Sequence, residues 1–72
     1  MTTLTALIAL VSFGHMAWHN EYRFGVKVAS DGSWWVCDFH GATFYQYPVN
    51  DMNEALESFG KTVANDPRWQ LL

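Results

Sequence analysis

An Asp-Gly dipeptide that separates two apolar runs is the feature that most constrains the fold. Asp31-Gly32 stands between an alternating segment, residues 22–28, and an aromatic segment, residues 34–40. Asp-Gly supplies the positive φ angles that a two-residue turn requires, so the pattern predicts a β-hairpin over about residues 22–40 with its turn at 31–32. The turn then decides which face of the sheet each side chain occupies.

A two-residue turn fixes the register of this hairpin. The expected pairs are Val28 with Trp35, Val26 with Cys37, and Phe24 with Phe39. These six side chains would share the face that packs on the core, and the alternate residues would occupy the opposite face. A large aromatic residue beside charged neighbours on a flat strand face is typical of interface hot spots. We therefore expect a partner-binding surface there, formed by Trp34, Val36, Asp38 and His40.

Residues 3–19 have the spacing of an amphipathic helix, because apolar residues recur at i, i+3, i+4 and i+7. The stripe consists of Leu4, Leu7, Ile8, Val11 and Trp18. No Lys, Arg, Asp or Glu occurs between Met1 and Asn20. Two alternatives stay open, a cleaved signal peptide and a membrane-associated segment, although the apolar centre is shorter than the ~20 residues needed to span a bilayer.

A third short strand is expected after the hairpin. Gly41 and Ala42 permit a second tight turn, and residues 43–47 are rich in aromatic side chains. Pro48 should end this strand, because proline has no N–H for the hydrogen-bond ladder.

The C-terminal part predicts a helix followed by an apolar tail. Asp51 and Glu54 have the spacing of a capping box, which opens a helix over about residues 51–64, and residues 67–72 form the tail. The chain, residues 1–72, is then a single α+β domain in the order α-β-β-β-α. Its antiparallel three-stranded sheet should carry the helices on one face.

Composition restricts the function classes. The chain of 72 residues has 4 Lys and Arg against 7 Asp and Glu, which gives a net charge of −3. A protein that tracks nucleic-acid phosphates needs clustered positive charge, so direct nucleic-acid binding is not expected. Single-stranded binding through the aromatic residues stays an alternative. Since aromatic residues make up 17% of the chain and charged residues only 15%, leftover apolar surface should be covered by a second copy or a partner.

Residues capable of chemistry are few. His15 and His19 would share a face of the expected first helix, and a metal site would need His40 or Cys37 to complete it. A single cysteine excludes an intramolecular disulfide framework. Asp38 and His40 are spaced for an acid–base pair, but no positioned nucleophile accompanies them. We therefore expect no enzyme, no metal site and no other cofactor.

A second candidate surface lies on the expected last helix. Asp51, Glu54 and Glu57 cluster in its first turns, where the helix dipole favours negative charge. These carboxylates are suited to meeting a basic surface on a nucleic-acid-processing protein. The alternative is a solvated helix face.

Residues 24–59 resemble the β-β-β-α unit of HicB-type antitoxins. The matching features are the Asp31-Gly32 turn, the aromatic strand at residues 34–36, Gly41, and the acidic segment of residues 51–56 with its Glu-Ala pair. The chain departs from that family at residues 38–41, which lack the proline usual before the glycine. The expected first helix is a further addition. The resemblance implies an antitoxin that neutralises an RNase toxin.

In its profile the chain is similar to phage-encoded anti-CRISPR proteins, since it is small, acidic and α+β, without catalytic residues. The likeness concerns the profile and no motif. It implies a non-enzymatic inhibitor that binds and occludes a CRISPR effector subunit or another nuclease in the cytoplasm of a phage-infected bacterium. The expected partner is therefore a protein, with a homodimer possible, and neither nucleic acid nor a membrane.

Overall fold

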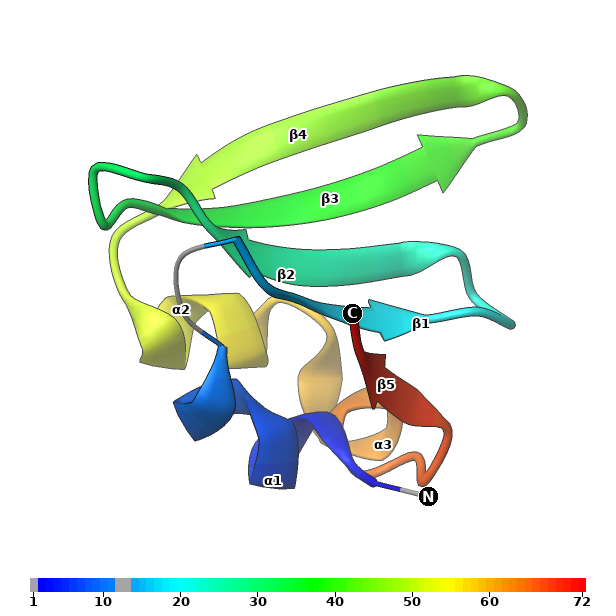
Figure 1. Ribbon diagram of the computed structural model, residues 1–72. Coiled ribbons are helices and arrows are strands. Elements are labelled where there is room, and N and C mark those ends of the chain that lie inside the picture. The colour runs from blue at the N-terminus through cyan, green and yellow to red at the C-terminus, as the bar shows by residue number, and fades with distance from the viewer. Residues whose placement is uncertain (1, 12–13) are drawn as a thin grey trace.

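The computed structural model describes residues 2–11 and 14–72, and it contains one five-stranded antiparallel sheet with short helices on one face (Figure 1). The strands follow the order β4-β3-β2-β1-β5 across the sheet. They are β1 (Met16–His19), β2 (Phe24–Val28), β3 (Trp34–His40), β4 (Thr43–Val49) and β5 (Trp69–Leu71). The helical elements are α1 (Leu4–Leu7), the 3-10 helix η1 (Ile8–Leu10), α2 (Met52–Glu57) and α3 (Gly60–Ala64).

The expected order α-β-β-β-α and the expected three-stranded sheet are wrong, and the first helix is the main reason. Its helical part ends at Leu10, and the chain returns as β1 after Gly14, which has a φ of +79°. Ala17 and His19 are fully buried while Trp18 points to the other face, which is a period of two. Strand alternation therefore replaces the helical spacing, and residues 12–13 of the expected helix lie outside the described residues.

The expected apolar tail, residues 67–72, contains an additional strand. β5 pairs with β1 at one edge of the sheet, and Trp69 is only 2% exposed. The Trp69 indole N–H donates to the Val63 carbonyl over 2.9 Å. Thr2 forms bridges to Arg68 and Trp69, so the N-terminal segment runs beside β5. The tail is thus part of the sheet and of the core.

The turn between β2 and β3 is longer by one residue than expected, and this changes the register. Ala29 N–H donates to the Ser33 carbonyl and Gly32 N–H to the Ala29 carbonyl, both over 2.9 Å. Gly32 alone has a positive φ in this turn, +86°, as in a type I turn closed by a glycine bulge. Asp31 does not have the positive φ that a two-residue turn would require, and its carboxylate accepts hydrogen bonds from the Ser33 N–H and hydroxyl.

The expected register of this hairpin is therefore wrong by one residue. The observed pairs are Phe24 with Asp38, Gly25 with Cys37, Val26 with Val36, Lys27 with Trp35, and Val28 with Trp34. A shift of one residue moves every side chain of β3 to the opposite face. The two faces of β3 are consequently exchanged relative to the expectation.

The expected second tight turn is confirmed. Gly41 has a φ of +63° and is followed by Ala42, and the flanking residues His40 and Thr43 are paired. This is the geometry of a turn with glycine at its first central position. β4 continues through Pro48 to Val49, beyond the expected end at residue 47, because β4 is an edge strand and proline is tolerated there.

The expected helix over residues 51–64 is divided into α2 and α3. The expected N-cap is confirmed, since Asp51 accepts from Glu54 N–H over 2.9 Å. The Glu54 carboxylate reaches back one residue further than in a capping box and accepts from Asn50 N–H, also over 2.9 Å. Residues 58–59 form a turn between the two helices, and Gly60, the first residue of α3, has a φ of +76°.

One hydrophobic layer lies between the helices and the sheet. Its buried residues are Leu4, Leu7, Ile8, Val11, Ala17, Val26, Val28, Val36, Ala55, Ala64 and Trp69. Both α1 and α2 contribute to it, so the short helices are held by packing rather than by their own length. Within residues 2–11 and 14–72, every helix is too short to cross a membrane.

Candidate functional site

The face of the sheet that points away from the helices carries a group of aromatic side chains. The helices of the described chain lie on the other face (Figure 1), and the alternate strand residues point outward. We define the outer aromatic face by Met16, Trp18, Lys27, Trp35, Phe39, Phe44 and Pro48. Of these, Phe44 is 41% exposed. Large apolar side chains thus line a sheet face that no described helix covers.

Contacts between rings organise this face. Trp18 meets Phe39 edge-to-face with ring centroids 6.0 Å apart, and Phe39 lies 4.8 Å from Phe44. The Trp35 indole N–H donates to the Ser33 hydroxyl over 2.8 Å, which fixes the ring beside the turn. The rings therefore form a fixed surface, in which the aromatic side chains need little ordering when a partner binds.

Arg23 adds a positive charge to the outer aromatic face. Its guanidinium carbon lies 4.9 Å from the centre of the Phe39 ring, within cation–π range. Backbone hydrogen bonds hold the residue on both sides, because Arg23 N–H donates to the His19 carbonyl over 2.8 Å and Phe39 N–H donates to the Arg23 carbonyl over 3.1 Å.

The backbone at Arg23 is strained. Its φ is +58°, and it is the one residue other than glycine with a positive φ in residues 2–11 and 14–72. A side chain in the left-handed region costs roughly 1–2 kcal/mol. Such strain is typical of functional positions, where surrounding structure keeps a side chain in place. Here the strained residue closes the turn between β1 and β2, and its guanidinium lies against the outer aromatic face.

Cys37 lies on the same side of the sheet, beneath the surface. It is fully buried, it pairs with Gly25, and it is not a member of the hydrophobic layer under the helices. Burial raises the pKa of the Cys37 thiol, and the charge of Lys27 opposes this effect only in part. The thiol is therefore kept protonated and unreactive, as expected for a structural cysteine.

Because the β2–β3 register differs by one residue from the expected one, Trp34 and Val36 do not lie on the outer face, where the sequence predicted a binding surface. Trp34 packs against the hydrophobic layer and Val36 is 8% exposed within it, so both point toward the helices. Their placement on the outer face was wrong, because the β2–β3 turn has three residues rather than two. The neighbouring Trp35 and Phe39 take the outer positions instead.

Asp38 and His40 also lie on the helix side of the sheet, near the far end of the β3–β4 hairpin. The His40 Nε2 is 2.7 Å from the Asp38 carboxylate, and the His40 side chain is 61% exposed. The ring of Tyr45 lies 5.0 Å from the His40 ring, and Tyr47 stacks next to Tyr45 at 6.4 Å. Asp38 and His40 are thus within hydrogen-bond distance of each other, at a solvent-exposed position on the hairpin.

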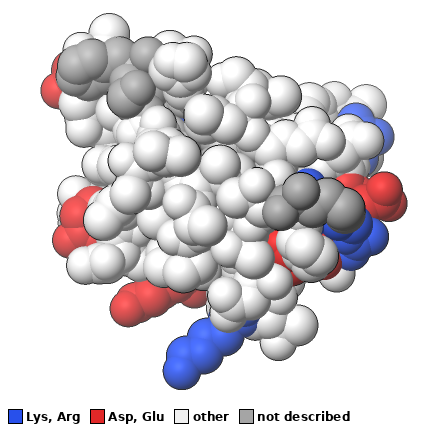
Figure 2. All heavy atoms as spheres, turned by 60° about the horizontal axis from the view of Figure 1, so that its bottom comes forward, with Lys and Arg blue, Asp and Glu red and all other residues white. Residues whose placement is uncertain are grey.

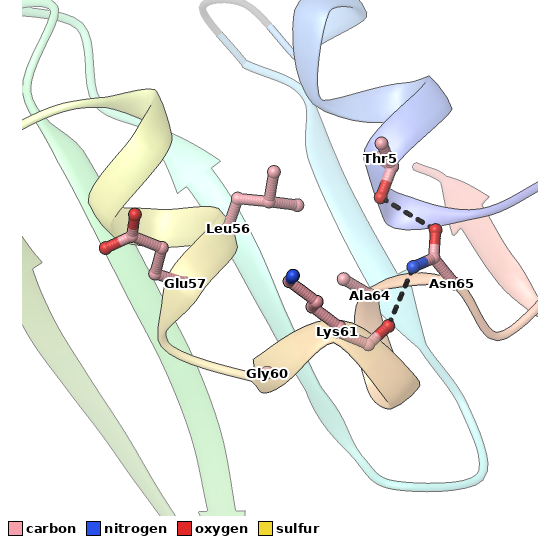
Figure 3. A pocket seen from close by; sticks show the side chains of 7 residues that line it. All are labelled: Thr5, Leu56, Glu57, Gly60, Lys61, Ala64 and Asn65. Atoms are coloured by element: carbon pink, nitrogen blue, oxygen red, sulfur yellow. Dashed lines mark hydrogen bonds between the residues drawn. The ribbon is translucent and has the colours of Figure 1, made fainter.

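The acidic residues of α2 lie on the helix side of the molecule. Figure 2 shows that side as a largely uncharged surface with acidic and basic side chains at its margins. Asp51 and Glu54 accept backbone hydrogen bonds at the start of α2, whereas Glu57 lines an apolar hollow of about 450 Å³. The hollow is drawn in Figure 3, and its other lining residues are Thr5, Leu56, Gly60, Lys61, Ala64 and Asn65.

The floor of this hollow is held by polar contacts between helices. The Thr5 hydroxyl donates to the Asn65 side chain over 3.2 Å, and the Asn65 amide donates to the Lys61 carbonyl over 2.9 Å (Figure 3). The first bond joins α1 to the end of α3, and the second holds the Asn65 side chain against the last turn of α3. Glu57 and Lys61 are the charged residues at the hollow, which makes it a second candidate surface.

His19 is a buried polar residue that sequence reasoning assigned to a possible metal pair with His15. It lies on β1, not on a helix, and its Nδ1 accepts from Tyr22 N–H over 3.2 Å. The Nε2 therefore carries the proton, and it lies 3.1 Å from the Asp66 carboxylate. In the part of the chain that the structure describes, no three His, Cys, Asp or Glu side chains gather as a metal site would need.

Nothing in the sequence indicated that Asp66 would lie next to His19. Asp66 forms an ion pair with Arg68 at 2.7 Å, and hydrogen bonds from Arg68 hold the pKa of the Asp66 carboxyl well below its usual range. His19 is brought to this pair only by the pairing of β1 with β5.

Comparisons with protein-family models, curated proteins and solved structures find no match to this chain. The likenesses to HicB-type antitoxins and to anti-CRISPR proteins therefore stay predictions.

Proposed function

We propose that this protein is a non-enzymatic inhibitor that binds a nuclease or a nucleic-acid-processing complex through the outer aromatic face. Its target would be a CRISPR effector, as for anti-CRISPR proteins, and it would act in the cytoplasm of a phage-infected bacterium. An antitoxin that neutralises an RNase toxin uses the same physical mechanism and is the second candidate. In both cases inhibition is by occlusion and needs no catalytic residue.

The position of Arg23 carries this proposal. Its guanidinium lies over the Phe39 ring, and Phe39 in turn contacts the rings of Trp18 and Phe44. Interface hot spots are enriched in tryptophan, tyrosine and arginine, in well-packed centres surrounded by weaker contacts. An arginine held against an uncovered aromatic surface fits that description, and its backbone strain opposes folding and so does not explain its presence.

The charge of this surface favours a protein over single-stranded nucleic acid. Arg23 and Lys27 are its basic residues, and the whole chain has a net charge of −3. Binding of single strands needs a positively charged groove together with free ring faces for stacking. One face of Phe39 is already covered by Arg23, and the ring also meets Trp18 edge-to-face.

The acidic net charge also suits the proposed class of target. Nucleases that bind DNA or RNA present basic surfaces, and complementary charge raises the rate at which two proteins meet. The carboxylates of the chain lie away from the strand positions of the outer aromatic face, at sites such as Asp31, Asp51 and Glu57. They are placed to steer the approach, whereas the aromatic side chains supply the contact.

A cleavage assay tests the proposal. Purified, guide-loaded CRISPR effectors and purified RNase toxins are titrated with the protein, and cleavage of a labelled DNA or RNA target is followed. We expect inhibition of one enzyme that is complete near equimolar protein. Trp35→Ala should weaken it at least tenfold, whereas the matched variant Glu57→Lys on the helix side should leave it unchanged.

Three outcomes of this assay would count against the proposal. Tight binding of free single-stranded DNA or RNA, lost steeply with added salt, would favour nucleic-acid recognition. Loss of inhibition with Glu57→Lys and not with Trp35→Ala would place the contact at the hollow between α1 and α3. Absence of inhibition across both enzyme classes would exclude both candidate functions.

A further inference from the structure

The side chains of the edge strand β4 are exposed from Thr43 to Pro48, and Val49 at its end is half-buried. It pairs with β3 on one side and forms the margin of the sheet in Figure 1. Tyr45 and Tyr47 are 42% and 46% exposed. The strand Thr43–Val49 contains no Lys, Arg, Asp or Glu. Proteins normally protect a long edge strand with charged side chains, because its free N–H and C=O groups can pair with another chain.

The other edge of the sheet is protected. β5 has three residues, and the bridges from Thr2 to Arg68 and Trp69 cover part of it. Arg68, at the start of this edge, also carries a charge that is paired with Asp66. In residues 2–11 and 14–72, β4 is thus the sheet edge that is long, neutral and open.

The register of the β3–β4 hairpin determines which backbone groups of β4 face outward. His40 and Thr43 flank the two-residue turn and pair with each other, so they exchange the first hydrogen bonds of the ladder. Along the hairpin, every second residue pair exchanges backbone hydrogen bonds in this way. The intervening residues Phe44, Gln46 and Pro48 therefore direct their backbone groups to the free edge. Pro48, which lacks an N–H, lies in this outward set, where no bond to β3 is lost.

We propose that β4 pairs with β4 of a second copy of this chain, antiparallel and about a two-fold axis at Gln46. Gln46 would then exchange both backbone hydrogen bonds with Gln46 of the second copy. The Phe44 N–H would reach the Pro48 carbonyl of the second copy, on both sides of the axis. Only the donor that Pro48 lacks is missing, at each end of the pairing.

The side chains of β4 are complementary to themselves in this register. The cross-strand pairs are Thr43 with Val49, Phe44 with Pro48, Tyr45 with Tyr47, and Gln46 with Gln46. Tyr45 and Tyr47 would meet at a non-hydrogen-bonded position, where side chains lie closest, and aromatic cross-strand pairs are stabilising. A register shifted by two residues would lose this matching.

The pairing closes as a dimer. Each chain contributes the same edge, so the contact is isologous and uses up the open edge of both copies. The two sheets become one, with both outer aromatic faces on the same side. The inference does not depend on the identity of any target, and an inhibition assay cannot confirm or refute it.

A charge-swap experiment at positions 45 and 47 tests the proposal. The molar mass of the wild-type protein is measured by sedimentation equilibrium from micromolar to millimolar concentration, and we expect a concentration-dependent dimer. The double variant Tyr45→Lys/Tyr47→Lys places like charges opposite each other at both cross-strand pairs, so its dissociation constant should rise about tenfold or more. Both side chains are exposed, and the melting temperature of the monomer should change little.

The matched variant Tyr45→Lys/Tyr47→Glu distinguishes the proposed register from any other contact. It places lysine opposite glutamate in the dimer and should restore dimerisation at low salt. A wild-type protein that stays monomeric at millimolar concentration would overturn the proposal. So would a Tyr45→Lys/Tyr47→Lys variant that dimerises as the wild type does, or a charge-swapped variant that is as monomeric as the double lysine variant.

Discussion

The indole ring of Trp18 lies across Gly25, its partner on the neighbouring strand. A Cβ atom at position 25 would be 2.7 Å from Trp18 Cε3 and 2.5 Å from the Ala17 carbonyl oxygen. Both distances are too short for real contacts, and a backbone oxygen within the ladder cannot move away easily. Gly25 thus allows the ring to rest on the sheet and to meet Phe39 on the outer aromatic face.

Gly25→Ala should destabilise the protein. Overpacking against the Ala17 carbonyl and the Trp18 ring should lower the free energy of unfolding by about 1–3 kcal/mol, as measured by urea denaturation. Ala42→Ser, which adds one atom at an exposed turn, serves as the control and should have little effect. Equal stability of Gly25→Ala and wild type would mean that Trp18 does not lie over Gly25.

Val36→Asp should unfold the protein or lower its free energy of unfolding by more than about 3 kcal/mol, because the carboxylate would be buried without a partner. The control, Thr62→Asp, changes an exposed residue of α3 and should be tolerated. Thermal melts compare the two. A register set by a two-residue turn would place Val36 on the outer face, so a well-folded Val36→Asp protein would support that register instead.

Cys37 should react slowly with thiol reagents in the folded protein. It is fully buried, and burial raises the pKa of its thiol, so little thiolate is present near neutral pH. The rate of modification by a maleimide should rise to that of a free cysteine in denaturant. Trp18→Ala should also raise the rate without unfolding the protein. Fast labelling of the native wild type would show that the outer aromatic face is not closed above Cys37.

Asp66 should make stability depend on pH. Hydrogen bonds from Arg68 lower the pKa of the Asp66 carboxyl in the folded state, with a smaller contribution from His19. The resulting stabilisation is complete above the unfolded pKa of about 3.9 and is lost as the pH falls through the folded value. Asp66→Asn should therefore melt at a lower temperature than wild type at pH 7, and the difference should shrink in acid. A difference that is constant with pH would contradict this ion pair.

The elements with strong local signals could be predicted from the sequence. The Asp51 N-cap, the Gly41-Ala42 turn and the alternation of residues 24–28 all formed as expected, because each depends on residues close in the chain. The segment at 16–19 could not be predicted in this way. Its buried alternation depends on pairing with β5, which lies about fifty residues further along the chain.

The length of the β2–β3 turn determined which residues of β3 lie on the outer face, and the expected turn was one residue too short. Asp31-Gly32 fits both a two-residue turn and a three-residue turn with a glycine bulge, and these differ in register by one. An uncovered aromatic sheet face was expected, but with Trp34 and Val36 in the places that Trp35 and Phe39 occupy. The hydrogen bonds of the turn and the strand pairs show that the three-residue turn forms.

If the outer aromatic face, together with Arg23 beside Phe39, is the inhibitory surface, then Arg23→Gly should weaken binding without unfolding the protein. Glycine relieves the strain of a φ of +58°, worth roughly 1–2 kcal/mol, while the lost contact with Phe39 costs roughly 0.5–1 kcal/mol. The variant should therefore be at least as stable as wild type, within about 1 kcal/mol.

The decisive measurement is the affinity of Arg23→Gly for the inhibited nuclease, by titration calorimetry beside wild type and Arg23→Lys. We expect about 30-fold weaker binding for Arg23→Gly, which corresponds to the ~2 kcal/mol of an interface hot spot. Arg23→Lys, which keeps the charge and loses the planar group, should fall between the two. Wild-type affinity in a stable Arg23→Gly protein would contradict the assignment of the outer aromatic face as the binding surface.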